Sequence, residues 1–155
     1  MKHDYNKMVD IEIPQEEADA LIGMPKYRIT NETWYYPSRG RSINIPLQSE
    51  DKRNNFMLDL WRSRLELNKI TYQNRAHQII ILVRLDLAGK PHKNPDDELL
   101  TGHHIHLYRE GYADKWAQPV PSGSFSNLSD QWQTLNDFMT YCNVVKEPNI
   151  IAGIE

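Results

Sequence analysis

The chain has 155 residues, of which 39% are hydrophobic, and a formal net charge of −3. This length fits one domain that needs no disulfide or structural metal to fold. Its only cysteine, Cys142, cannot form an internal disulfide, which is typical of a reducing compartment. No apolar run approaches the roughly 20 residues that span a membrane, and the polar N-terminus lacks a signal-peptide core. We therefore expect a cytoplasmic protein with no membrane partner.

The charged residues are spread unevenly along the chain. Residues 39–84 contain nine Lys and Arg against four Asp and Glu, although they form no dense basic block. Basic side chains on one side of a sheet can attract phosphate. They can equally be the solvated face of a half-buried sheet, and both interpretations stay open.

The sequence predicts helices near both ends. Residues 14–22 suit a short helix, because Pro14 fits a first turn and Gly23 would end it. Residues 130–142 suit a longer helix with Ser129 as its N-cap. Its expected core-facing stripe is Trp132, Leu135, Phe138, Met139 and Cys142. On that stripe Cys142 is expected to be a small buried hydrophobic residue and not a nucleophile.

Between the helices, the sequence has the patterns of strands. Segments rich in aromatic, β-branched or alternating residues predict strands at 26–36, 42–47, 55–61, 65–73, 78–87 and 103–110. Short turns join most of them, which favours antiparallel pairing. We therefore predict an α+β fold: a single twisted antiparallel β-sheet of about five or six strands in a meander, packed with the short N-terminal and longer C-terminal helices. Residues 1–155 are expected to form a single domain, with 1–12 as a candidate flexible arm.

Residues 102–116, GHHIHLYREGYADKW, hold the most distinctive polar pattern. Because side chains alternate across a strand, His104, His106 and Tyr108 would share one face. Pairing this strand with 78–87 through their apolar residues would bring two charged side chains to the same face. The expected opposite pairs are Asp86 with His104 and Arg84 with His106.

The loop that joins these two strands, residues 88–102, carries His92, which could fold back over the strands. The candidate catalytic residues are therefore His104, His106, Arg84, Asp86, Tyr108 and His92. Histidine can give or take a proton near neutral pH, arginine can hold phosphate, tyrosine can stack on a base and aspartate can fix a histidine tautomer. The alternative is that these residues are ordinary polar side chains on a solvent-exposed sheet face, with no functional role.

A metal-binding interpretation is also open. Histidines two apart on a strand point the same way, and Asp86 or His92 could complete a metal site. The segment from His104 through His106 to Glu110 resembles the start of the first metal motif of cupins. The primary interpretation assigns no metal and no cofactor.

Three segments together resemble an uncharacterised family of small bacterial and prophage proteins. They are LVRLDLAGKPHKNPDDE, then HHIHLYREGYADKWA, then the acidic and aromatic C-terminal helix, and the resemblance spans about residues 40–150. It implies a bacterial or phage origin but no particular activity. The chain also resembles, more weakly, the small ribonuclease toxins of toxin–antitoxin pairs, which would imply RNA cleavage by Arg84, His92, His104, His106 and Tyr108.

Three functions follow as hypotheses, and the sequence leaves open whether the chain is an enzyme. The first is a nucleic-acid- or phosphate-directed enzyme, such as a toxin-like nuclease, with RNA or an antitoxin as partner. The second is a non-enzymatic interaction protein of a mobile element or defence system, with a surface of exposed aromatic residues. The third is a small metal-binding protein.

Overall fold

The computed structural model describes residues 12–153. The two helices in this range are α2 (Gln15–Gly23) and α3 (Gln131–Tyr141). The longer strands are β3 (Ser42–Gln48), β4 (Asn55–Arg62), β5 (Ile70–Ala76), β6 (Ile80–Leu87) and β9 (His104–Leu107). The shorter strands are β1 (Lys26–Arg28), β2 (Thr33–Tyr35), β7 (His92–Lys93), β8 (Leu99–Leu100), β10 (Ala117–Pro119), β11 (Val144–Lys146) and β12 (Asn149–Ile151).

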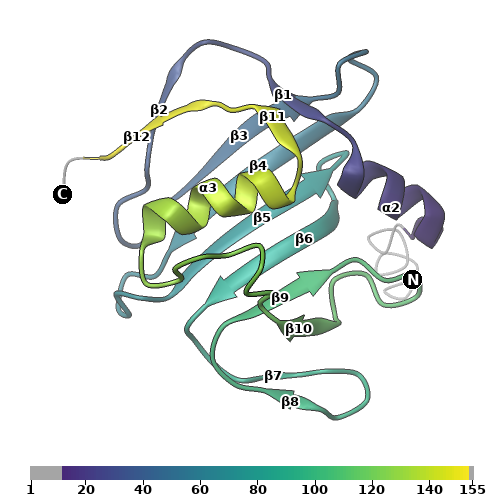
Figure 1. The fold of residues 1–155 in the computed structure, drawn as a ribbon, viewed down its shortest axis with the longest axis vertical. Coiled ribbons are helices and arrows are strands. Elements are labelled where there is room, and N and C mark those ends of the chain that lie inside the picture. The colour runs from purple at the N-terminus through teal and green to yellow at the C-terminus, as the bar shows by residue number, and fades with distance from the viewer. Residues whose placement is uncertain (1–11, 154–155) are drawn as a thin grey trace, which may run out of the picture.

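The main sheet has eight strands in the order β10-β9-β6-β5-β4-β3-β1-β11 (Figure 1). Strands β3 to β6 form the predicted antiparallel meander, and β9 and β10 extend it. At the other edge β11 pairs with β1 in parallel. The α+β class is confirmed, but the prediction of five or six strands is wrong. The difference comes from strands of three residues, which are too short to show an alternating pattern.

The predicted segment 26–36 does not form one strand. Its first part, β1, belongs to the main sheet, whereas β2 forms a separate parallel pair with β12. In Figure 1 β12 runs alongside β2, although the two strands lie far apart in the sequence. Segment 26–36 is therefore divided between two sheets, because β1 pairs with β11 and β2 pairs with β12.

Helix α3 covers the apolar face of the sheet, as Figure 1 shows. The ring of Phe138 lies 5.9 Å from that of Tyr72 on β5, and both side chains are fully buried. The predicted stripe is buried at Leu135, Phe138, Met139 and Cys142. Trp132, in the first turn of the helix, is 42% exposed, and its ring centroid lies 5.9 Å from that of Tyr36. The N-cap is Asp130 and not Ser129, since the Asp130 carboxylate accepts a hydrogen bond from the Gln133 amide.

The opposite face of the central strands is polar. The expected pairing is confirmed: Leu85 lies opposite Ile105, Asp86 opposite His104 and Arg84 opposite His106. One strand further along the sheet, Thr71 of β5 lies opposite Asp86. The apolar partners turn toward α3, so the register carries all of these polar side chains to the other face.

The predicted functional loop, residues 88–102, contains the β7–β8 hairpin. Asn94 fastens this hairpin to β10: its side chain donates to the Ala117 carbonyl and accepts from the Ala117 amide, both at 2.9 Å. These bonds are buried. The hairpin is thereby held beside the polar face of β9.

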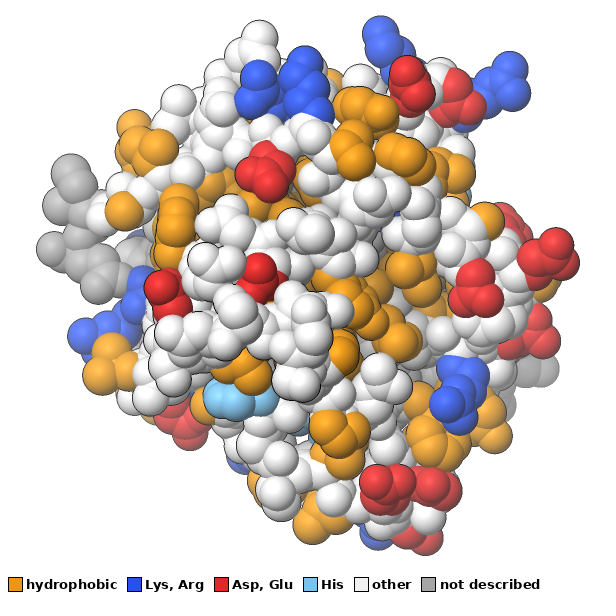
Figure 2. Space-filling view, viewed as in Figure 1, with side chains coloured by type: hydrophobic (Ala, Val, Ile, Leu, Met, Phe, Trp, Pro, Cys, Tyr) orange, Lys and Arg blue, Asp and Glu red, His pale blue; other side chains and the backbone are white. Residues whose placement is uncertain are grey.

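Charged side chains are scattered over the face of the molecule that carries α3 (Figure 2). Lys and Arg residues do not gather into one basic area in this view. Neither helix in the described range is long and apolar enough to cross a membrane. Almost all of the candidate flexible arm, residues 1–11, lies outside the described residues.

Candidate functional site

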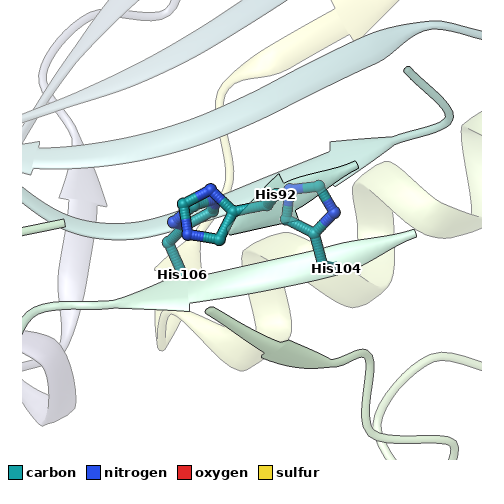
Figure 3. Close-up of side chains that lie close together, drawn as sticks. All are labelled: His92, His104 and His106. Carbon is teal, nitrogen blue, oxygen red and sulfur yellow. The ribbon is translucent and has the colours of Figure 1, made fainter. Parts of the chain in front are cut away.

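Three imidazoles lie together on the polar face of the sheet. His104 and His106 come from β9, and His92 comes from β7 and lies against both (Figure 3). The ring centroids of His92 and His106 are 4.6 Å apart, those of His104 and His106 5.0 Å, and those of His92 and His104 5.6 Å. One nitrogen from each ring lies within 4.8 Å of the other two. The prediction that His92 folds back over β9 is therefore confirmed.

Backbone carbonyls fix the orientation of all three rings. Nδ1 of His104 lies 3.1 Å from the Gly102 oxygen, Nδ1 of His106 lies 2.7 Å from the Asp114 oxygen, and Nε2 of His92 lies 2.8 Å from the Lys115 oxygen. A carbonyl oxygen can only accept, so each of these ring nitrogens is protonated and donates. The other nitrogen of each neutral imidazole then carries a lone pair.

Asp86 lies between two of the imidazoles. Its Oδ2 is 3.4 Å from Nε2 of His104 and 3.1 Å from Nε2 of His106. Its Oδ1 accepts a hydrogen bond of 2.8 Å from the Thr71 hydroxyl. Burial acts to raise the pKa of Asp86, but its close contacts with Nε2 of both histidines and the charge of Arg84 outweigh it and hold the pKa well below its usual range. Asp86 is therefore a carboxylate at neutral pH.

The same contact changes the titration of His104. Its hydrogen bond to Asp86 raises the pKa of His104 above the ordinary value, although burial opposes the shift. A cation on the Nε2 side of this ring, either a proton or a metal ion, is stabilised by the Asp86 carboxylate.

Arg84 is tied into the site through three of its nitrogens. Nη1 lies 2.6 Å from Asp114, Nε lies 3.2 Å from Asp86, and Nη2 lies 3.1 Å from Nε2 of His106. The sequence pattern suggested that Arg84 would hold a phosphate. With these contacts in place, the guanidinium instead braces the carboxylates and one imidazole.

Tyr108 does not join the cluster. Its hydroxyl accepts from the Ile13 amide at 2.9 Å and donates to the Ile13 carbonyl at 2.8 Å. Strand β9 ends at Leu107, and the chain then turns through a bridge between Arg109 and Ala113. The predicted alternation stops where the strand stops, which is why Tyr108 leaves the face that it was expected to share.

Glu110, the acidic residue of the cupin-like segment, also lies elsewhere. Its side chain accepts a hydrogen bond of 2.8 Å from the backbone amide of Gln15, at the start of α2. Its own amide donates to the Gln15 side chain at 2.9 Å. Glu110 therefore joins the turn after β9 to α2 and contributes nothing to the histidine cluster.

Several residues that complete the site were not among the candidates predicted from the sequence. Thr71 and Asp114 hold Asp86 and Arg84, Asn94 positions the hairpin that carries His92, and Lys69 and Lys90 line the cavity over the cluster. That cavity has a volume of about 220 Å³. Lys90, Asn94 and Asp114 lie inside two of the three segments that carried the family resemblance, which was a usable signal. Lys69 lies in the basic stretch 39–84, but nothing in the pattern singled out either lysine as a site residue.

The fold and the site define an α+β protein whose curled, mostly antiparallel sheet carries a three-histidine cluster on its polar face. The chain belongs to DUF6978, a family of unknown function, whose model matches residues 13–144. This agrees with the expected membership of an uncharacterised family. Comparison with curated proteins and with solved structures found no match.

Proposed function

We propose that this protein binds one divalent transition-metal ion through His92, His104 and His106, with Asp86 as the fourth ligand. The observation that carries the proposal is the orientation of the rings. Each imidazole donates one N–H to a backbone carbonyl, as metal-bound histidines almost always do. Three lone pairs then meet beside a carboxylate, and such a group of donors is stabilised by a cation.

The distances support a tetrahedral centre. Metal–ligand bonds of about 2.1 Å give a tetrahedron with edges of about 3.4 Å. The two Nε2 atoms of His104 and His106 lie 3.4 and 3.1 Å from Oδ2 of Asp86, which matches such an edge. The three nitrogens are within 4.8 Å of one another, so binding needs a contraction of about an ångström or more along the longest separation.

The charges and the ligand chemistry also favour a transition metal. Imidazole suits zinc, copper, iron and nickel, whereas calcium and magnesium prefer oxygen ligands. Arg84 would oppose a cation, but it lies between the carboxylates of Asp86 and Asp114, so its charge is balanced. The centre would have one carboxylate and three neutral imidazoles as ligands. A divalent ion bound to them therefore leaves a net positive charge.

The proposal is tested by titrating chelator-treated protein with Zn²⁺ and measuring the heat of binding. We expect one ion per chain. Co²⁺ in its place should give the intense visible absorption of a four-coordinate site. His104→Ala should weaken binding at least about 100-fold, more than the loss typical of an outer-shell change.

His103→Ala is the matched control, because its side chain is exposed and its Nδ1 accepts from the Ala88 amide, outside the cluster. It should bind Zn²⁺ as the wild type does. The proposal is overturned if none of Zn²⁺, Mn²⁺, Fe²⁺, Co²⁺ and Ni²⁺ binds saturably, or if a folded His104→Ala variant binds equally well. Circular dichroism of each variant separates lost binding from lost folding.

A second candidate is a metal-free, phosphate-directed enzyme that cleaves RNA with His104 and His106 as general acid and base. It is favoured by Asp86, which lies within hydrogen-bonding reach of one imidazole and close to the other. In this version chelator-treated protein should cleave RNA and His106→Ala should not. Expression of the wild type should slow bacterial growth while His106→Ala does not, and equal tolerance of both would count against the toxin-like version.

A further inference from the structure

We infer that the ligand of this site is a phosphate group, bound beside the metal by Lys69 and Lys90. The inference rests on the proposed metal centre and names the class of molecule that the centre meets. It also adds two lysines, which the sequence did not single out, to the anion-binding role that the sequence suggested for Arg84.

The cavity over the histidines limits the size of the ligand. Its volume of about 220 Å³ is below the roughly 300–1,000 Å³ typical of pockets that enclose a drug-sized molecule. It admits a small anion or the terminal group of a larger molecule. His92, His104, His106 and Asp86 are part of its lining, so a ligand that enters the cavity meets the metal centre.

The charge of the cavity selects an anion. Its lining has three cationic side chains, Lys69, Arg84 and Lys90, against the single carboxylate of Asp86. Asp114 balances Arg84 from behind. One positive charge is left over before any metal is added, and a divalent ion raises the excess to three. A dianionic phosphate satisfies this excess better than a monoanionic carboxylate does.

Lys69 is held at the rim by its packing. Its aliphatic chain lies against Gly89, where an added Cβ would come within 3.3 Å of the Lys69 Cε. Its ammonium lies 5.9 Å from the centre of the Trp61 ring. The stem therefore packs on the loop at Gly89 and the ammonium lies near an aromatic ring, while the residue lines the cavity.

Metal binding would make Arg84 available as well. The lone pair on Nε2 of His106 can be shared with one partner, and without a metal that partner is the Arg84 Nη2–H at 3.1 Å. Once a metal ion takes this lone pair, the N–H loses its acceptor and can donate to an anion on the metal. Zinc can accept such an anion as a fifth ligand. The order of binding is then metal first and phosphate second.

The test measures binding of inorganic phosphate to the Zn²⁺-loaded full-length protein by calorimetry. We expect saturable binding that weakens at least about tenfold in Lys69→Ala and in Lys90→Ala, because each removes a charge that contacts the anion. Lys146→Ala on the distant strand β11 is the matched control and should bind as the wild type does. Acetate should bind more weakly than phosphate.

The outcomes separate this inference from the proposed function. If Zn²⁺ binds but phosphate does not, or binds equally well in both lysine variants, the phosphate inference is overturned and the metal centre stands. Acetate binding as tight as phosphate binding also overturns it. If Zn²⁺ does not bind, the metal centre fails, and lysine-dependent phosphate binding to the metal-free protein would still support the anion site. A 5′-phosphorylated oligonucleotide that binds tighter than inorganic phosphate identifies a nucleic-acid end as the source of the group, and the reverse identifies free phosphate.

Discussion

At the scale of single residues, Asp86 has the largest number of connections in the site. Its two oxygens contact Thr71, Arg84 and both histidines of β9. It is negatively charged because these partners outweigh the burial that would otherwise raise its pKa. An amide of the same size would keep the packing but lose one of the two oxygens and the negative charge on which the metal ligand and the ion pairs depend.

We therefore predict that Asp86→Asn lowers Zn²⁺ affinity by about 10–100-fold while the protein stays folded. Titration calorimetry measures the affinity, and circular dichroism checks the fold. Asp97→Asn is the control, since this exposed carboxylate pairs with Lys93 on the surface, at 3.4 Å, and lies outside the cluster. Unchanged Zn²⁺ affinity in Asp86→Asn would show that Asp86 is not a ligand.

At the scale of elements, the β7–β8 hairpin decides whether the site is complete. His104 and His106 are placed by a strand inside the main sheet, but His92 stands on a strand of two residues. That strand pairs with β8 and not with the main sheet. The two hydrogen bonds between Asn94 and Ala117 are thus a principal tie between His92 and the rest of the site.

Asn94→Ala should release this hairpin. We expect a stability loss of about 1–3 kcal/mol, because two buried hydrogen bonds lose their partner, together with weaker Zn²⁺ binding from a displaced His92. Chemical denaturation and Zn²⁺ titration measure the two effects. Lys93→Ala on the same hairpin removes an exposed side chain and should change neither. Wild-type Zn²⁺ affinity in Asn94→Ala would show that other contacts hold His92 in place.

At the scale of the whole molecule, the fold is closed by contacts between its two ends. Strand β11 pairs with β1, and the ammonium of the buried Lys26 donates to the carbonyls of Ile22, Met24 and Cys142. Burial lowers the pKa of Lys26 to about 8, although the neighbouring Cys142 opposes the shift. Burial also raises the pKa of the Cys142 thiol to about 12, which fits the expected role of a buried, unreactive side chain.

The Lys26 shift predicts how stability depends on pH. Below about pH 8 Lys26 is protonated in both the folded and the unfolded chain, so it contributes no pH dependence. Between about pH 8 and 10.5 the unfolded chain binds more protons, so the free energy of unfolding rises with pH. The slope is at most about 1.4 kcal/mol per pH unit. Lys26→Met should lack this rise. Both proteins carry Cys142→Ala in this comparison, because the charge of Lys26 also lowers the pKa of the Cys142 thiol. Denaturation curves at several pH values measure the rise, and a constant difference across the window would contradict the prediction.

The sequence was sufficient wherever a strand is regular. The alternation of β6 and β9 is a local property, and a slip of one residue between them would turn the apolar side chains of one strand to the polar face. Asp86, Arg84, His104 and His106 can therefore be placed together from the amino-acid pattern alone. Tyr108 was misplaced because the same alternation was extended past Leu107, where the strand ends.

The remaining parts of the site and the sheet depend on contacts between distant segments. The Asn94–Ala117 bonds, the Asp114 brace on Arg84 and the packing of Lys69 against Gly89 each join residues that lie 20 or more positions apart. The β1–β11 pair joins the two ends of the chain. A periodic pattern indicates only which way neighbouring side chains point. Burial and hydrogen bonding in the complete fold decide which distant segment packs beside them. For this reason only the tertiary structure shows the complete histidine cluster and the two lysines that line its cavity.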